Sequence, residues 1–219
     1  MEAAIFDLDG TIMDSMWLWS SLADRFLLSM GIEPPAGGFF RRFRKMTLDE
    51  SCQYMQENFD IGRDASEIKR GIKELIAVHY REKFKPKPHV LEILEEFRDR
   101  QIRMVLATAS YESMANIVLE RYSIGDYFEF VQTVDNTGLK KSGPEFFQLI
   151  IDRLDIEPES IWVFEDALHC IESAKRCNLN IVAIEDESAS ADRERIKEIA
   201  DIYIEDFSQL DIDELFEYE

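Results

Sequence analysis

The chain has 219 residues, of which 46% are hydrophobic, so it can form one large domain or a core with a smaller insert. Its 25 basic and 45 acidic residues give a formal net charge of −20, which argues against a nucleic-acid backbone or an anionic membrane as the main partner. The sequence contains no apolar run of about 18 residues, so no membrane span is expected.

The cysteines and histidines are few and lie far apart in the sequence. The three cysteines, Cys52, Cys170 and Cys177, are odd in number, and none of the three histidines has a ligand-like spacing. We therefore expect reduced core thiols in a cytoplasmic protein, rather than a disulfide framework or a zinc site. The first apolar run begins almost at Met1, which leaves no room for a signal peptide.

The first predicted element is a short buried strand at residues 3–6, followed at once by Asp7-Leu8-Asp9-Gly10-Thr11. An extended chain points Asp7 and Asp9 the same way, and like charges held that close repel each other and raise a pKa. Such a pair needs a cation, a shared proton or strong hydrogen bonds, and a Mg²⁺ site would satisfy this need. The plainer alternative is a strand end closed by an Asx turn, and a bare pair of this kind favours it.

Residues 15–85 contain helical patterns and no clear strand. Helices are expected at roughly residues 15–30, 48–58 and 66–84. The Lys-Pro-Lys-Pro sequence at residues 85–88 is typical of a hinge. This part of the chain is therefore predicted to form a helical insert.

Beyond the hinge, predicted strands alternate with predicted helices. The strands lie near residues 104–107, 128–131, 161–164, 180–184 and 201–204, and the helices near residues 89–100, 113–122, 145–154, 171–177 and 193–199. This alternation predicts βαβ units and a mostly parallel sheet, which places functional sites at the carboxyl ends of the strands. The acidic end, residues 206–219, is expected to form a short solvated helix.

Polar residues follow three of these later strands. Thr108-Ala109-Ser110 offers a hydroxyl and amides at a helix start, which suits an anion about as well as an ordinary N-cap. Lys140-Lys141 precedes the next helix; paired lysines are usually solvated, but one could reach a carboxylate or a phosphate. Glu165-Asp166 repeats the acidic ending of the first strand. Asp166 alone could cap a helix, but two acidic pairs at one sheet edge suit Mg²⁺.

In this order the motifs resemble those of the haloacid dehalogenase-like superfamily, in the subgroup of β-phosphoglucomutase-like phosphatases with a helical cap. The stretch from Asp7 to Ser15 resembles the first motif, and Thr108, Lys141 and Glu165-Asp166 match the next three. The resemblance covers nearly the whole chain. It implies a Rossmann-like, mostly parallel α/β core at residues 1–14 and 86–219, with an inserted all-helical cap domain at residues 15–85.

The same resemblance implies a Mg²⁺-dependent phosphatase that hydrolyses a small phosphorylated metabolite through an aspartyl-phosphate. Asp7 would be the nucleophile, and Asp9 would protonate the leaving oxygen and then deprotonate the attacking water. Asp7, Asp166 and the backbone carbonyl of Asp9 would bind Mg²⁺. Glu165 would be either a ligand or a residue that acts through water.

The resemblance also implies a phosphate-binding set. Thr108, the Ala109 amide and Lys141 would hold the phosphoryl oxygens, and Lys141 would also pair with Asp7. The family usually has Lys-Pro-x-Pro-Asp at its third motif, whereas this chain has Lys-Ser-Gly-Pro-Glu at residues 141–145. The choice between Lys140 and Lys141 is therefore open at this point.

Further histidines and aromatic residues bear on the alternatives. His89 and His169 are expected to be structural or exposed rather than catalytic. A dehalogenase would lack a carboxylate at Asp9. A β-phosphoglucomutase-type sugar-phosphate mutase would carry a histidine near Trp19 and an arginine near Leu48, so a simple phosphatase is favoured. A non-catalytic binding or regulatory protein on the same fold is the second alternative.

The predicted cap carries a group of cations in a strongly acidic chain. Arg41, Arg44 and Lys45, with Trp19 on the first cap helix, are possible substrate contacts, because a closing cap can hold an anionic group. A solvated basic surface is an equal alternative for the cations, and a packed interior is the commoner one for the tryptophan. The sequence leaves the metabolite unnamed and leaves both a monomer and a small homo-oligomer open.

Overall fold

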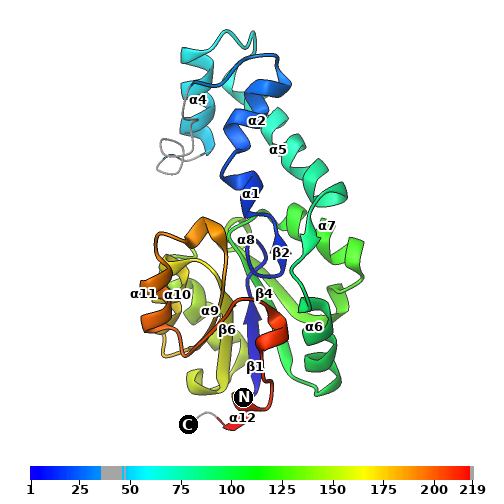
Figure 1. Ribbon diagram of the computed structural model, residues 1–219, viewed down its shortest axis with the longest axis vertical. Coiled ribbons are helices and arrows are strands. Elements are labelled where there is room, and N and C mark those ends of the chain that lie inside the picture. The colour runs from blue at the N-terminus through cyan, green and yellow to red at the C-terminus, as the bar shows by residue number, and fades with distance from the viewer. Residues whose placement is uncertain (36–45, 47, 218–219) are drawn as a thin grey trace. The chain divides into compact units, whose positions relative to one another are not determined.

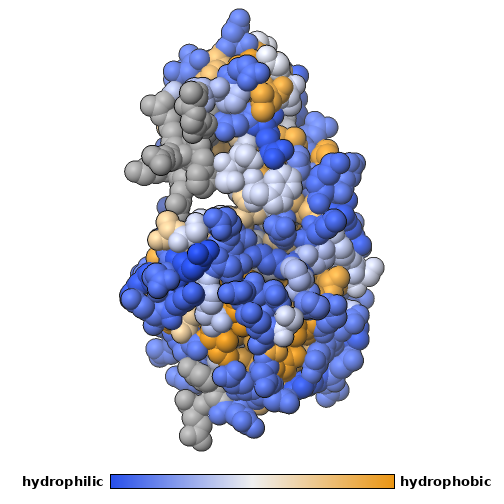
Figure 2. All heavy atoms as spheres, in the orientation of Figure 1, coloured by the Kyte–Doolittle hydropathy of each residue, from blue (hydrophilic) through white to orange (hydrophobic). Residues whose placement is uncertain are grey.

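The computed structural model describes residues 1–35, 46 and 48–217 (Figure 1). The chain divides into two compact units, one formed by Met1–Ser15 with Lys85–Glu219 and the other by Met16–Phe84. We call them the core unit and the helical unit. Hydrophilic residues cover most of the visible face of the core unit (Figure 2). Among the described helices, none is long and apolar enough to cross a bilayer.

The core unit is built on a six-stranded parallel sheet. Its strand order is β5-β4-β1-β6-β7-β8. The strands are β1 (Ala3–Phe6), β4 (Arg103–Thr108), β5 (Phe128–Thr133), β6 (Ile161–Glu165), β7 (Asn180–Ile184) and β8 (Ile202–Ile204). All neighbouring strands pair in parallel, which confirms the predicted Rossmann-like α/β core. The first strand therefore lies in the middle of the sheet, between β4 and β6.

Helices connect these strands and flank the sheet. They are α6 (Val90–Asp99), α7 (Glu112–Tyr122), α8 (Val134–Thr137), α9 (Pro144–Leu154), α10 (Leu168–Lys175), α11 (Arg193–Ile199) and α12 (Glu214–Glu217). The predicted acidic end thus contains a short helix. Single 3₁₀ turns, η1 (Gly125–Tyr127), η2 (Pro158–Ser160), η3 (Glu187–Ala189) and η4 (Phe207–Gln209), complete the connections. Helix α8 was not predicted from the sequence.

Alternate side chains of the strands face opposite sides of the sheet. Ile5 and Val163 belong to an apolar cluster that also takes in buried residues of α9, α10 and α11. Phe6 and Phe164 stack with 4.4 Å between ring centroids, and Phe97 of α6 lies 5.8 Å from each. Both faces of the central strands are therefore covered, which is why these strands are short apolar runs in the sequence.

The chain passes from the core unit to the helical unit and back again, and the two segments of the core unit next to these connections pair with each other. Strand β2 (Met13–Asp14) pairs antiparallel with β3 (Lys85–Pro86), which begins the segment predicted to be a hinge. The backbone N–H of Lys87 then donates to the Ile12 carbonyl at 2.8 Å. This pairing fixes the C-terminal part of the first motif.

The helical unit contains α1 (Met16–Trp19), α2 (Leu22–Ser29), α4 (Leu48–Asn58) and α5 (Ala65–Glu82), and no strand among its described residues. The prediction of one helix over residues 15–30 was wrong, because the chain breaks between α1 and α2. The hydroxyls of Ser20 and Ser21 donate to the Trp17 carbonyl at 3.0 and 2.8 Å. Such local bonds compete with the helical hydrogen bonds and favour an interruption.

A buried hydroxyl in α10 provides a stability test of the core. Ser173 is 0% exposed, and within the described part of the chain its Oγ has no hydrogen-bond partner. We expect Ser173→Ala to raise the free energy of unfolding by about 0.5–1.5 kcal/mol, because it removes an unpaired buried hydroxyl and improves helix propensity. Urea denaturation measures this change. A destabilisation of similar size would show that the hydroxyl is hydrogen-bonded.

Candidate active site

The candidate site lies where β1, β4 and β6 end together. Phe6 is paired with Leu106 of β4 and with Phe164 of β6, so the strands reach the carboxyl edge in register. Directly beyond this register, the Asp7 N–H donates to the Phe164 carbonyl at 3.0 Å. Thr108 and Glu165 are the last residues of β4 and β6. Residues far apart in the sequence therefore meet at one edge of the sheet.

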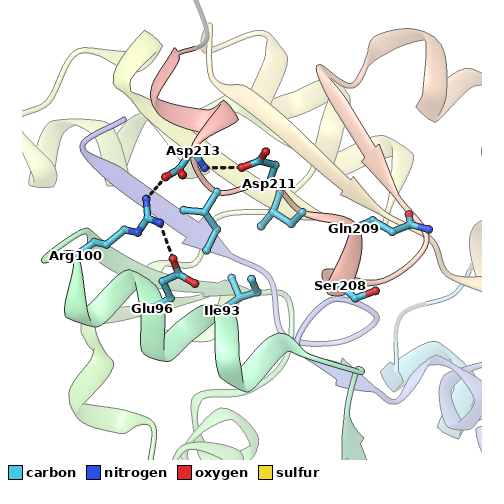
Figure 3. A pocket seen from close by; sticks show the side chains of 9 residues that line it. Ile93, Glu96, Arg100, Ser208, Gln209, Asp211 and Asp213 are labelled. Atoms are coloured by element: carbon cyan, nitrogen blue, oxygen red, sulfur yellow. Dashed lines mark hydrogen bonds and ion pairs between the residues drawn. The ribbon is translucent and has the colours of Figure 1, made fainter.

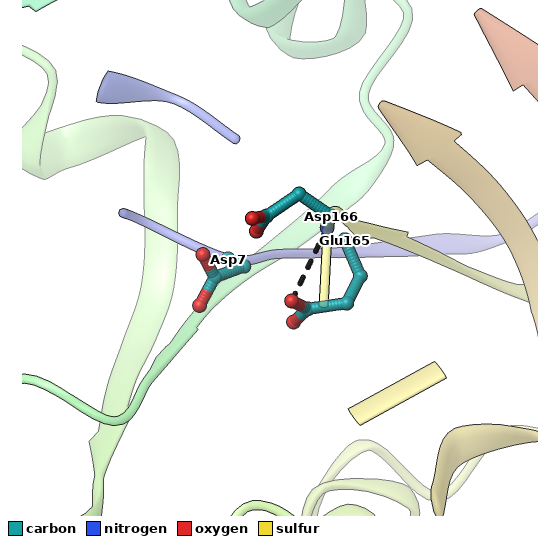
Figure 4. A group of neighbouring side chains, drawn as sticks. All are labelled: Asp7, Glu165 and Asp166. Carbon is teal, nitrogen blue, oxygen red and sulfur yellow. Dashed lines mark hydrogen bonds between the residues drawn. The ribbon is translucent and has the colours of Figure 1, made fainter. Parts of the chain in front are cut away.

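Three buried carboxylates converge at this edge (Figure 4). One oxygen from each of Asp7, Glu165 and Asp166 lies within 4.8 Å of the other two. Burial, and next the Glu165 charge, raise the pKa of both Asp7 and Asp166 well above the usual aspartate value. The group is therefore costly to ionise unless a cation lies among its oxygens.

Lys141 supplies one such cation. Its Nζ lies 2.5 Å from Asp7 Oδ1 and 2.6 Å from Glu165 Oε2, and its side chain is only 3% exposed. Burial opposes its charge, but the two carboxylates outweigh this effect and raise its pKa, so the ammonium stays protonated. Lys140, by contrast, is exposed. Of the two candidate lysines, the structure brings Lys141 to the carboxylates.

Both carboxylate oxygens of Asp9 accept hydrogen bonds from serine hydroxyls. Its Oδ1 accepts from Ser15 Oγ at 2.6 Å, and its Oδ2 accepts from Ser110 Oγ at 2.5 Å. The Ser110 N–H in turn donates to Thr108 Oγ1 at 3.0 Å. Sequence reasoning named Ser15 in the first motif and Ser110 in the Thr108-Ala109-Ser110 stretch, but it assigned neither serine to Asp9. Ser110 thus links the end of β4 to Asp9.

The remaining predicted phosphate-binding and metal-binding groups lie beside these residues. Ala109 is exposed next to buried Thr108. Glu165 Oε1 accepts from the Asp166 and Ala167 amides at 3.2 and 3.0 Å. Since its Oε2 accepts from Lys141, both carboxylate oxygens of Glu165 already have hydrogen-bond partners.

Gly10 leaves the space that the Asp166 carboxylate fills. Its φ is +90°, and a Cβ built at this position would lie 2.4 Å from Asp166 Oδ2. No other residue fits here without displacing Asp166. The site therefore offers three buried carboxylates, and the glycine at position 10 leaves room for one of them. Carboxylate oxygens of this kind fit a hard divalent cation such as Mg²⁺.

Four residues of the predicted cap were named as possible substrate contacts. Arg41, Arg44 and Lys45 fall outside the described residues. Trp19 is half-buried in the helical unit, and its Nε1 has no hydrogen-bond partner among the described residues.

The two histidines of the core unit are exposed, which for His169 is the expected result. His89 precedes α6 with a left-handed φ of 64°. His169 lies on the exposed side of α10. Neither residue takes part in the hydrogen bonds described above for the site.

A pocket of ≈ 400 Å³ lies between α6 and the C-terminal segment (Figure 3). Arg100, one of its lining residues, donates to Asp213 and to Glu96, both at 2.6 Å. The cationic group of this pocket is therefore already paired. None of the lining residues belongs to the carboxylate group.

The crowding of carboxylates predicts a pH-dependent stability. Burial raises the pKa of Asp166 in the folded state above its ordinary value of 3.8. The stability that the protonated carboxyl contributes is therefore fully present below a pH of 3.8. It is lost as the pH rises through the raised pKa of the folded state. We expect Asp166→Asn, measured in EDTA, to be more stable than wild type at pH 8 by roughly 1 kcal/mol or more. The difference should disappear near pH 4, and equal stabilities at pH 8 would contradict the burial argument.

A model of the haloacid dehalogenase-like hydrolase family matches residues 4–184. The chain is 30% identical over 179 residues to a phosphorylated carbohydrates phosphatase of Thermotoga maritima, with 82% of each chain covered. It is similar to the crystal structure of a putative β-phosphoglucomutase from Thermotoga maritima, with 28% identity, a TM-score of 0.77 and coverage of 93% and 94%. A family IA hydrolase from Entamoeba histolytica matches its fold at a TM-score of 0.80, with 18% identity and coverage of 99% and 98%.

Proposed function

This chain belongs to the haloacid dehalogenase-like hydrolase family and is a phosphoric monoester hydrolase, and from this premise we propose a Mg²⁺-dependent phosphatase that acts through an aspartyl-phosphate on Asp7. The observation that carries the proposal is the meeting of Asp7, Lys141 and Asp166 at one sheet edge. We also infer a cytoplasmic location, because the three cysteines are free and buried.

Asp7, Asp166 and the Asp9 backbone carbonyl would hold the ion. Glu165 would act through water, since both of its oxygens already accept hydrogen bonds. When bound, Mg²⁺ would neutralise charge on the transferring phosphoryl oxygens. The protein would supply the fixed positions of these groups.

Asp7 would attack the phosphorus through its carboxylate oxygen. The O–P bond to Asp7 forms as the ester O–P bond breaks, and Asp9 gives its proton to the leaving oxygen. Asp9 then takes a proton from water, which attacks phosphorus and breaks the bond to Asp7. Lys141, Thr108 and the Ala109 amide would hold the phosphoryl oxygens through both steps.

The two serines would keep Asp9 in position for this double role. Ser15 and Ser110 each contact a different oxygen of its carboxyl group. A hydroxyl can donate to an ionised carboxylate or rotate to accept from a protonated one. The same contacts can therefore serve before and after proton transfer.

The substrate class is a small phosphorylated metabolite, and phosphorylated carbohydrates are the first to test. This choice follows from the substrate class in the name of the 30% identical relative. The mutase alternative is separated in the same experiment: a hexose 1-phosphate and its bisphosphate would give an isomer without net release of phosphate. We expect phosphate release.

The two adjacent lysines provide the test of the proposed site. We expect Lys141→Ala to lower kcat/KM for p-nitrophenyl phosphate with Mg²⁺ by roughly 100-fold or more, because it removes a preorganised cation from the transferring group. Lys140→Ala, the matched control, should keep wild-type activity, because its side chain is exposed. EDTA should abolish hydrolysis by the wild-type protein. Activity without a divalent cation, or an equal loss in both variants, would contradict the proposal.

A further inference from the structure

A second lysine of the core unit, Lys87, is largely shielded from solvent and pairs with Asp186. Its ammonium donates to the Glu185 carbonyl at 2.6 Å and lies 2.9 Å from Asp186 Oδ2. The side chains of Lys87 and Asp186 are only 10% and 8% exposed, so salt screens this ion pair weakly. The backbone contact of Lys87 with Ile12 also ties it to the loop of the first motif.

The Lys87–Asp186 pair lies at the same sheet edge as the carboxylate group. Strands β6 and β7 are parallel, with Glu165 opposite Ala183, so Asp166 and Asp186 follow neighbouring strands at one edge. Burial and Glu165 raise the pKa of Asp166 most, Asp186 raises it further, and Lys87 lowers it. The pair is therefore close enough to act on Asp166 through its charge.

The charges at this edge add up to a value that one divalent cation neutralises. The buried charged groups are the carboxylates of Asp7, Glu165, Asp166 and Asp186 and the ammoniums of Lys141 and Lys87. Four negative and two positive charges leave a net charge of minus two. Asp9 is not part of this sum, because its two carboxylate oxygens accept from Ser15 and Ser110 rather than from a member of the group.

We propose that Lys87 sets the net charge of the metal site: by binding Asp186, it keeps a fourth carboxylate out of that site. This inference rests on the proposed Mg²⁺-dependent function and deepens it. The ion pair acts as a neutral unit, so removing either member changes the charge near Asp166 by one. Removing the carboxylate leaves a cation that repels Mg²⁺, and removing the lysine leaves an anion that attracts it.

The two single substitutions change the charge beside Asp166 in opposite directions, so they should change Mg²⁺ affinity differently. We expect Asp186→Asn to weaken Mg²⁺ binding, measured by titration calorimetry with magnesium chloride alone, by about tenfold or more. Lys87→Met should bind Mg²⁺ at least as tightly as wild type. Its melting temperature in EDTA should nevertheless fall, because Asp186 is left buried without its partner.

The double variant separates charge from structure. Lys87→Met combined with Asp186→Asn removes one charge of each sign, so its Mg²⁺ affinity should return to within about threefold of wild type. Lys85→Met, an exposed position two residues earlier, is the control and should leave the affinity unchanged.

The results distinguish this inference from the proposed function. If wild type binds Mg²⁺ and hydrolyses phosphate esters, but both single variants bind weakly and the double variant no better, the pair is merely structural and the inference is wrong. If wild type itself does not bind Mg²⁺, the proposed function and this inference both fail.

Discussion

Replacing Asp7 with Asn should reduce kcat for p-nitrophenyl phosphate by about 10⁴-fold or more, which is the scale of removing a covalent nucleophile. An amide oxygen cannot form the aspartyl-phosphate, and the ion pair from Lys141 to Asp7 Oδ1, at 2.5 Å, is lost as well. The fold should persist, because the change removes a buried carboxylate whose pKa is raised by burial and by Glu165. Steady-state kinetics and the melting temperature in EDTA measure both effects.

Asp126→Asn is the control for this substitution, because Asp126 is an exposed carboxylate in η1. It should retain wild-type activity. Mass spectrometry of the acid-quenched enzyme should find a phosphorylated Asp7 peptide in wild type and none in Asp7→Asn. Substantial activity in Asp7→Asn would remove Asp7 as the nucleophile, and with it the proposed aspartyl-phosphate.

Gly10→Ala should lower both Mg²⁺ affinity and kcat, the latter by roughly 100-fold or more, since small displacements at a reacting centre carry costs of this size. The new Cβ would lie 2.4 Å from Asp166 Oδ2, so the carboxylate has to move out of its position beside Asp7. The alanine also takes a φ of +90°, which adds strain of about 1–2 kcal/mol. Calorimetric titration with Mg²⁺ and steady-state kinetics report the displacement.

Gly138→Ala separates strain from collision. Gly138 has a φ of +71°, and a Cβ there would meet no atom within 4 Å. Its alanine variant should lose stability to a similar degree but keep Mg²⁺ affinity and activity. If the two variants lose activity equally, backbone strain rather than the position of Asp166 explains the effect.

The regular elements of the core were predictable because each rests on a local pattern. Strand β7 is an apolar run that is found at the predicted residues 180–184, and α11 at residues 193–199. The break after α1 and the short helix α8 were not predicted. Both depend on side-chain bonds to the backbone: Ser21 Oγ donates to the Trp17 carbonyl, and Thr133 with Asn136 forms a capping box. Such bonds depend on a particular rotamer, which apolar periodicity does not reveal.

By itself, the sequence determined the alternation of strands and helices and the acidic or hydroxyl residues at the strand ends, because these depend on neighbours within a few positions. Only the tertiary structure decided between Lys140 and Lys141, assigned Ser15 and Ser110 to Asp9, and paired Lys87 with Asp186. These contacts join segments up to 134 positions apart. Their formation depends on strand register and on which side chain is buried, and both are set when the whole sheet packs.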